Sequence, residues 1–248
     1  MIIWITGAST GIGRELARQY AMLGHSVFAT ARSAENLETL AHECEASSSS
    51  VTPMPGDVCD VQSMQSIFKE ICDQKGVPDL VVLNAGTHKP TSATKFVLED
   101  HLRLMDINFN GVLNGFDACL PALLERGSGQ IAVVASVAGY RGLPRAGAYG
   151  ASKAGLINLC ESMQPELMAE GIDLRLVCPG FIKTPLTDLN DFPMPFLMPV
   201  EKAVQAIIKG LKSNKFLIQF PWQMGLMMQL LRHMPNWLYL KVVKKISG

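Results

Sequence analysis

At 248 residues, the chain is long enough for one large α/β domain or two small ones. Hydrophobic residues make up 48% of it and charged residues 18%, which excludes an intrinsically disordered chain. The 22 basic residues balance 22 acidic ones, so no global charge points to nucleic acid as a partner.

Apolar runs of strand length alternate with helical patterns along the chain. We expect strands at 2–6, 25–31, 79–84, 130–136 and 173–179, a short one in 51–57, and a last one at 215–220. We expect helices near 12–23, 34–46, 61–75, 98–126, 149–170 and 200–211. Unbroken apolar strands between helices are typical of a parallel sheet covered on both faces. The order predicts a single doubly wound α/β domain over 1–248, with a mainly parallel sheet of about seven strands between helical layers.

The first strand runs into the stretch TGASTGIG (6–13), and a helical pattern follows. Gly7, Gly11 and Gly13 remove side chains where a backbone would turn tightly and approach a pyrophosphate. The helix N-terminus would add free N–H groups and partial positive charge. A glycine triplet in this position predicts a dinucleotide site. The alternative is a tight strand-to-helix turn with no ligand.

The second strand ends in TARS (30–33), where an acidic residue would accept the ribose hydroxyl of NAD. No acidic residue stands there, and Arg32 takes the region instead. A guanidinium suits a 2′-phosphate, and Ser9, Thr10 and Ser33 could add hydroxyl donors. The pattern therefore predicts NADP rather than NAD. The alternative is a solvated arginine at the start of the next helix.

The stretch AYGASKAG (148–155) places Tyr149 and Lys153 four residues apart on a predicted helix. Residues at this spacing share one face, so both side chains can face one cleft. A nearby ammonium, together with a positively charged oxidised nicotinamide, favours the phenolate of a tyrosine whose pKa is otherwise near 10, which suits a general acid and base. Ser136, at the end of a predicted strand, could hydrogen-bond a substrate oxygen. Taken singly, the pair could lie on the surface and the serine could cap a strand.

Together these motifs resemble the short-chain dehydrogenase/reductase family, from residue 2 to about 185. The stretch TGASTGIG matches the family's TGxxxGxG, and LNAG (83–86) matches its NNAG except at Leu83. The resemblance implies a Rossmann fold, an NAD(P)-dependent oxidoreductase, and a catalytic set of Asn108, Ser136, Tyr149 and Lys153.

The resemblance also implies where the cofactor lies. Lys153 would hold the nicotinamide ribose hydroxyls, and Asn108 would position a water that passes protons to Lys153. Asn108 could instead, or also, brace the sheet. The expected cofactor-binding residues are Gly7, Ser9, Thr10, Gly11, Ile12, Gly13, Arg32, Asp57, Val58, Asn84, Ala85, Gly86, Tyr149, Lys153, Pro179, Gly180, Ile182 and Thr184.

A Met- and Phe-rich loop at 187–199 follows the last matching motif, and the resemblance implies that the region 185–211 covers the active site. Such a wall favours hydrophobic ketones, aldehydes or alcohols as substrates. The loop could equally only pack onto the domain. His88 and Lys89 are candidates for the substrate entrance. The five histidines and six cysteines do not cluster in the sequence, so we expect no metal site.

The segment 222–248 is basic and apolar, and Glu201 is the last acidic residue of the chain. Met224, Met228 and Leu231 follow helical spacing, and Pro235 would end that helix before another begins. This tail could cover the domain, meet a second subunit, or lie on a membrane surface. The resemblance implies a homodimer or homotetramer that forms through the helices at 98–126 and 149–170.

The first residues read as a strand rather than a signal peptide, and no apolar run reaches the length of a membrane span. We therefore expect a cytoplasmic protein, peripheral to a membrane if the tail binds lipid. Our interpretation is an NADP(H)-dependent oxidoreductase that interconverts a carbonyl and an alcohol on a hydrophobic substrate, with Tyr149 as acid and base. The alternative is an NADP-binding sensor or scaffold that acts at a membrane through its tail.

Overall fold

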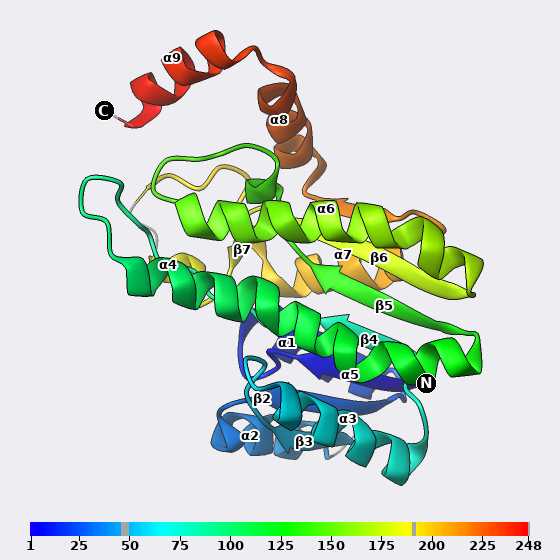
Figure 1. The fold of residues 1–248 in the computed structure, drawn as a ribbon. Helices are drawn as coiled ribbons and strands as arrows, with labels where there is room; N and C mark the ends of the chain where they lie inside the picture. The colour runs from blue at the N-terminus through cyan, green and yellow to red at the C-terminus, as the bar shows by residue number, and fades with distance from the viewer. Residues whose placement is uncertain (46–49, 190–191, 248) are drawn as a thin grey trace.

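A seven-stranded sheet forms the centre of the computed structural model, which describes residues 1–45, 50–189 and 192–247. The strand order is β3-β2-β1-β4-β5-β6-β9, and every neighbouring pair is parallel (Figure 1), which confirms the predicted doubly wound fold. The strands are β1 (Ile2–Thr6), β2 (Ser26–Ala31), β3 (Val51–Pro55), β4 (Leu80–Leu83), β5 (Gly129–Val134), β6 (Ile172–Pro179) and β9 (Leu217–Phe220). A separate short pair joins β7 (Ile182–Lys183) to β8 (Met198–Pro199).

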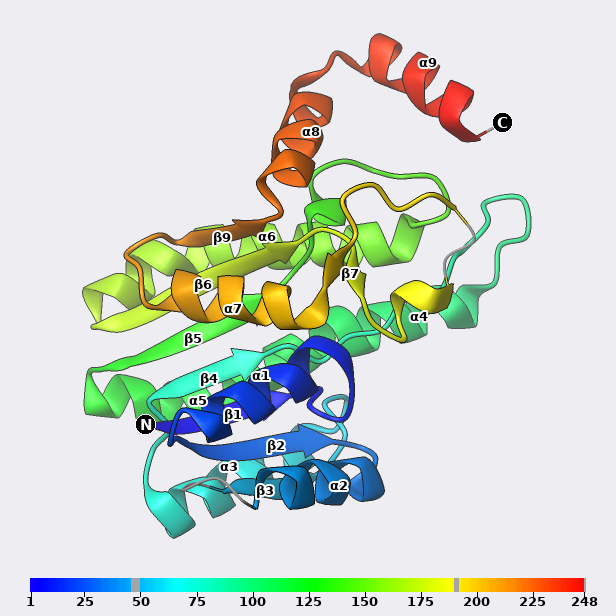
Figure 2. The same ribbon diagram turned by 180° about the vertical axis from the view of Figure 1, so that it is seen from behind.

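Helices cover both faces of this sheet (Figures 1 and 2). One layer holds α1 (Gly11–Met22), α2 (Ala34–Cys44) and α7 (Val200–Leu211). The other holds α3 (Val61–Lys75), α4 (Leu98–Met105), α5 (Gly111–Arg126) and α6 (Gly147–Ala169). Successive residues of a strand point to opposite faces, so Ile3 and Ile5 enter the core under the first layer and Trp4 enters the core under the second. Both faces are buried, which is why the strands are apolar throughout.

The predicted helix at 98–126 divides into three parts. Between α4 and α5 the chain forms a π-helical turn, Asp106–Asn110, which contains the buried Asn108. A π turn carries one residue more than an α turn, and such turns are frequent at functional sites. The strand predicted at 130–136 ends earlier, at Val134, so Ser136 lies beyond β5 at the start of a short 3-10 turn.

Two helices follow the last strand and stand outside the layers (Figures 1 and 2). They are α8 (Trp222–His233) and α9 (Asn236–Ser247), and the break between them falls at Pro235 as predicted. Met224 and Met228 on the inner face of α8 join the core beneath α6. Within the described ranges, no helix is both long enough and apolar enough to cross a bilayer.

Candidate active site

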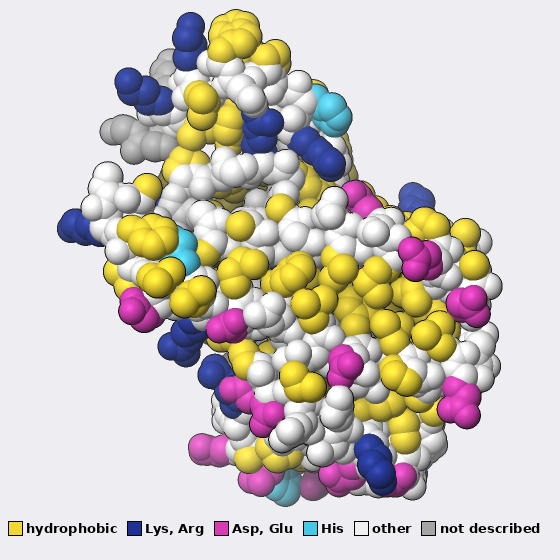
Figure 3. Space-filling model, in the orientation of Figure 1, with side chains coloured by type: hydrophobic (Ala, Val, Ile, Leu, Met, Phe, Trp, Pro, Cys, Tyr) yellow, Lys and Arg dark blue, Asp and Glu magenta, His cyan; other side chains and the backbone are white. Residues whose placement is uncertain are grey.

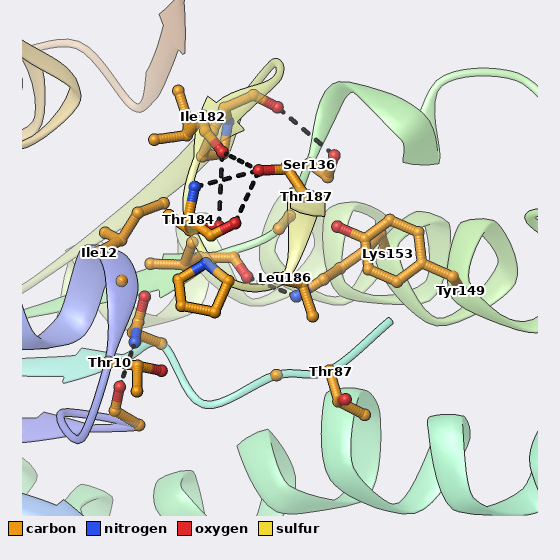
Figure 4. A pocket seen from close by; sticks show the side chains of 18 of the residues that line it. Thr10, Ile12, Thr87, Ser136, Tyr149, Lys153, Ile182, Thr184, Leu186 and Thr187 are labelled. Carbon is orange, nitrogen blue, oxygen red and sulfur yellow. Dashed lines mark hydrogen bonds between the residues drawn. The ribbon is translucent and has the colours of Figure 1, made fainter. Parts of the chain in front are cut away.

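A pocket opens at the carboxyl ends of the central strands, where ligands of doubly wound sheets bind. Figure 4 shows Thr10 and Ile12 on one side of it, and Ser136, Tyr149 and Lys153 on the other. Its lining residues are Gly7, Thr10, Gly11, Ile12, Asn84, Gly86, Thr87, Val134, Ala135, Ser136, Tyr149, Lys153, Pro179, Gly180, Ile182, Thr184, Pro185, Leu186 and Thr187. The pocket therefore brings together the predicted phosphate turn and three of the four predicted catalytic residues.

The glycine turn between β1 and α1 requires its glycines for two different reasons. Gly7 and Gly11 have positive φ angles of 68° and 57°, which other residues rarely adopt. A Cβ on Gly7 would also lie 2.6 Å from the Ala85 Cα, and one on Gly13 would lie 2.3 Å from the Gly7 carbonyl oxygen. Gly13 thus packs the helix against the turn, while Gly7 and Gly11 face the pocket.

Asn84 and Ala85 brace this turn from the end of β4. The Thr6 hydroxyl accepts hydrogen bonds from the backbone N–H groups of Asn84, at 3.0 Å, and Ala85, at 3.2 Å. The Asn84 amide donates in return to the carbonyl oxygens of Thr6, at 3.0 Å, and Gly7, at 3.2 Å. These bonds hold the ends of two adjacent strands together, so Asn84 fixes the geometry of the turn as well as lining the pocket.

Tyr149 and Lys153 share the inner face of α6, as their spacing predicted. The Lys153 side chain is buried, and its Nζ donates to the Val134 carbonyl oxygen at 2.8 Å. The same Nζ lies 6.0 Å from the centre of the Tyr149 ring. Ser136 reaches the pair from the turn after β5, where its hydroxyl also accepts a bond from the Ala138 N–H at 3.1 Å. The serine therefore caps a turn and lines the pocket.

Burial dominates the electrostatics of this pair. Burial raises the pKa of Tyr149, and a hydrogen bond with Ser136 opposes that rise only in part. Burial also lowers the pKa of Lys153 to about 8. Removal from water dominates at both groups, and the Lys153 amine is bonded to a carbonyl oxygen. The lowered pKa of Tyr149 that we expect from the ammonium together with an oxidised nicotinamide stays a prediction.

Asn108 lies behind the pocket and uses both ends of its side-chain amide. Its Oδ1 accepts from the Thr87 N–H at 2.7 Å, and its Nδ2 donates to the Thr87 carbonyl oxygen at 2.9 Å. Nδ2 also lies 3.3 Å from the Ser152 hydroxyl oxygen. A Cβ built on Gly86 would be 3.3 Å from Asn108 Oδ1 and 3.5 Å from Lys153 Nζ, so both groups approach one point. The bracing role is observed, and the proton relay stays a prediction.

Six predicted cofactor residues lie outside the pocket lining: Ser9, Gly13 and Ala85 next to the glycine turn, and Arg32, Asp57 and Val58 further along the sheet edge. Arg32 follows β2 and is exposed, and Asp57 and Val58 follow β3. The Asp57 carboxylate accepts from the Cys59 N–H at 3.0 Å, and Val58 is buried. The strands β1, β2 and β3 are adjacent, so these residues continue the edge on which the glycine turn sits. That place fits the far end of a dinucleotide.

Thr87, Val134 and Ala135 line the pocket and were not predicted, whereas Pro185, Leu186 and Thr187 begin the region 185–211 that was expected to cover the active site. Thr187 closes the loop after β7, because its hydroxyl donates to the Ile182 carbonyl oxygen at 2.7 Å (Figure 4). The signal for Thr87 was its position alone, directly after the motif LNAG. In the predicted loop 187–199, residues 190–191 lie outside the described ranges.

The two candidates for the substrate entrance differ. The His88 ring packs edge-on against the Tyr149 ring, with centroids 4.7 Å apart. The Lys89 ammonium pairs instead with the Asp100 carboxylate at 2.7 Å. His88 therefore contacts the pocket tyrosine directly, whereas Lys89 joins its loop to α4.

Comparisons with known proteins agree on one family. A sequence model described as short chain dehydrogenase matches residues 1–191. An uncharacterized oxidoreductase of Myxococcus xanthus is 37% identical over 95% of this chain and 93% of its own. A 3-oxoacyl-[acyl-carrier-protein] reductase of Thermotoga maritima is 33% identical over 74% of this chain and 75% of its own.

Solved structures share the fold along most of their length. Actinorhodin polyketide ketoreductase, solved with NADPH, is 25% identical, with a TM-score of 0.81 over 90% of this chain and 97% of its own. A short chain dehydrogenase/reductase of Burkholderia phymatum, solved with NAD, is 21% identical, with a TM-score of 0.85 over 92% of each chain. The second likeness supports the fold alone, and the two differ in cofactor.

Proposed function

This chain belongs to the short-chain dehydrogenase family of oxidoreductases, and we propose that it interconverts a carbonyl and an alcohol on a hydrophobic substrate with NADP(H). The observation that carries the proposal is a single pocket lined by the glycine turn and by Ser136, Tyr149 and Lys153. The turn fits a pyrophosphate, since a side chain at Gly7 would collide with the Ala85 backbone. The reductase names of two relatives support carbonyl chemistry.

NADP(H), held between the glycine turn and Lys153, would supply the hydride chemistry. The Tyr149 hydroxyl donates its proton to the carbonyl oxygen of the substrate, and the Ser136 hydroxyl hydrogen-bonds the same oxygen. The raised pKa of Tyr149 keeps the hydroxyl protonated at neutral pH, which suits reduction. Lys153 stabilises the phenolate that remains, and Asn108 stands where a water could return a proton to it.

The preference for NADP rests on Arg32. Arg32 is exposed at the end of β2, on the edge that continues from the glycine turn. The neighbouring Arg14 is already engaged, since its guanidinium pairs with Glu43 at 2.9 Å and donates to the Asn36 carbonyl oxygen at 2.8 Å. These observations support Arg32 as the guanidinium that would meet a 2′-phosphate.

The loop that follows β7 is the evidence for a hydrophobic substrate. Phe192, Phe196 and Leu197 leave 40%, 48% and 41% of their surface exposed, which is more than packing onto the domain requires. The Phe192 ring contacts the Phe181 ring edge-on at 5.9 Å, which anchors this loop beside the pocket segment 179–187. An apolar carbonyl compound would complete that wall.

Equilibrium binding of NADPH and NADH, followed by fluorescence, tests the cofactor. We expect the wild type to bind NADPH at least tenfold more tightly, and Arg32→Ala to lose that preference. Arg103→Ala, on the exposed face of α4, is the matched control and should keep it. Equal binding of both cofactors by the wild type would contradict the assignment of Arg32.

The Tyr149→Phe variant tests catalysis. Loss of the proton donor should lower the rate of reduction of an apolar ketone or aldehyde by about 10²-fold to 10⁴-fold while NADPH binding is retained. Tyr140→Phe is the control, because Tyr140 lies near the site but its hydroxyl donates to Gln219 Oε1 at 2.6 Å. Unchanged activity in Tyr149→Phe would support the scaffold alternative. That alternative is disfavoured here because a scaffold needs no buried lysine beside the tyrosine.

A further inference from the structure

The helices α8 and α9 leave a row of large apolar side chains in water. The row consists of Trp222, Leu226, Leu230, Trp237 and Leu240, with 69%, 53%, 65%, 64% and 63% of their surface exposed. On α8 these residues recur every four positions, so they form a stripe opposite the buried Met224 and Met228. We call this row, together with Arg232, Lys241 and Lys244, the tail surface.

All the charged side chains of the tail surface are basic. Residues 222–248 contain Arg232, Lys241, Lys244 and Lys245 and no aspartate or glutamate. The Lys241 ammonium lies 5.3 Å from the centre of the Trp237 ring, so cation and indole stand side by side on α9. Figure 3 shows hydrophobic and basic side chains intermixed over these helices. A face of tryptophan, leucine and lysine is typical of a helix that lies in a membrane interface.

Specific contacts fix the orientation of α9. The Arg141 guanidinium donates to Asn236 Oδ1 at 2.5 Å and lies 4.4 Å from the centre of the Tyr239 ring. The buried Tyr239 donates its hydroxyl to the Gly142 carbonyl oxygen. The inner face of α9 is therefore held to the loop before α6. Trp237 and Leu240 take no part in these contacts and are exposed.

We propose that the tail surface docks on the anionic surface of a lipid bilayer, with α8 and α9 lying in the interface. The apolar stripe would enter the headgroup region, while the basic groups meet the negative lipids. A second copy of the chain is a poorer occupant, because a two-fold contact would bring the basic patch against itself. Folding back onto the domain is excluded by the contacts that hold the inner face of α9.

Co-sedimentation of the full chain with sucrose-loaded vesicles tests this proposal. Wild-type protein should pellet with vesicles of phosphatidylcholine and phosphatidylserine, and much less with phosphatidylcholine alone. Added salt should weaken binding, since it screens the charges. The Lys241→Glu/Lys244→Glu double variant should reduce the partition coefficient by at least about thirtyfold, because two basic residues are lost near an anionic surface and two negative charges are added. Trp237→Gln/Leu240→Gln should reduce it on the order of tenfold.

Matched controls separate the tail surface from general effects of charge and exposure. Lys202→Glu/Lys209→Glu makes the same change in net charge on the exposed side of α7. Met22→Gln/Leu23→Gln removes two exposed apolar side chains at the end of α1. Both controls should bind as the wild type does. All the substituted side chains are exposed, so each variant should fold, which circular dichroism checks.

Three results would overturn the proposal. Wild-type protein that stays in the supernatant with phosphatidylserine vesicles does not dock on anionic lipid. Equal loss of binding in both charge variants assigns the effect to net charge rather than to the tail surface. A change of molar mass by light scattering in Trp237→Gln/Leu240→Gln, without any vesicle binding by the wild type, assigns the surface to a second copy of the chain. None of these outcomes depends on the proposed enzymatic function.

Discussion

The side-chain amine of Lys153 is an ionisable group in a buried position. Its side chain is 4% exposed, and its amine has one protein partner, the Val134 carbonyl oxygen, among the hydrogen bonds of the described residues. Removing an ammonium from water is unfavourable, and for this reason the pKa of Lys153 falls to about 8. The site therefore accepts a loss of stability to keep a cation beside the tyrosine.

The Lys153→Met variant should be more stable than the wild type at pH 7. Each unit between the ordinary pKa and about 8 corresponds to about 1.4 kcal/mol, so the lysine costs about 3 kcal/mol there. The variant also loses the hydrogen bond of Lys153, which lowers its stability by about 1 kcal/mol. The free energy of unfolding from urea titrations should therefore rise by about 2 kcal/mol, in a variant that no longer catalyses reduction.

The difference in stability between Lys153→Met and the wild type should depend on pH. The folded lysine releases its proton near pH 8, whereas the unfolded lysine keeps it to about pH 10.4. The wild type binds fewer protons when folded, so it gains stability as the pH rises between those values. The advantage of Lys153→Met should be full below pH 8 and shrink towards pH 10. Lys75→Met, at an exposed position in α3, should show no such trend. An advantage independent of pH would point to packing instead of charge.

At the scale of elements, the π turn between α4 and α5 accounts for the position of Asn108. Asn108 is fully buried, and its amide satisfies both the N–H and the carbonyl oxygen of Thr87. Thr87 belongs to the irregular stretch after β4. The pairing of β4 with β5 ends at Leu83, so it supplies no partner for the backbone groups of Thr87. The side chain of Asn108 thus acts as the partner that an adjacent strand would otherwise supply.

The Asn108→Ala variant should lower the free energy of unfolding by about 3 kcal/mol, because it leaves two backbone groups of Thr87 unpaired. Asn110→Ala is the control two residues later. Asn110 is exposed and bonds to Asp106 on its own turn, so its loss should change stability by less than about 0.5 kcal/mol. Urea unfolding of both variants gives the comparison, and equal effects would assign the cost to the π turn itself.

The sequence predicted the elements and the motif residues better than it predicted their surroundings. Gly7 and Gly11 were predictable because a backbone turn with positive φ admits few other residues. The π turn was not, since one extra residue does not interrupt the apolar pattern of 98–126. The burial that raises the pKa of Tyr149 could not be predicted either, because burial depends on the whole fold. Thr87 reaches the pocket through a loop that carries no periodic signal.

At the scale of the whole molecule, two apolar surfaces lie on different elements. The tail surface belongs to α8 and α9, which are tied through Arg141 and Tyr239 to the loop between Ser136 and α6. The second surface belongs to α5 and α6, where Figure 3 shows hydrophobic side chains gathered over a broad face. On α5, Leu113 and Leu124 leave 37% and 40% of their surface exposed. This second face carries no excess of basic residues comparable to that of the tail.

We expect the α5–α6 face to join two copies of the chain, as the family resemblance implies. A two-fold contact places the same patch on both subunits, so Leu113→Glu/Leu124→Glu would set carboxylates opposite one another within the interface. Light scattering after size exclusion should give at least a dimer for the wild type and a monomer for this variant. Trp237→Gln/Leu240→Gln should keep the wild-type mass, because the tail surface faces lipid. If the tail variant dissociates while the α5–α6 variant does not, the two surfaces have been assigned the wrong way round.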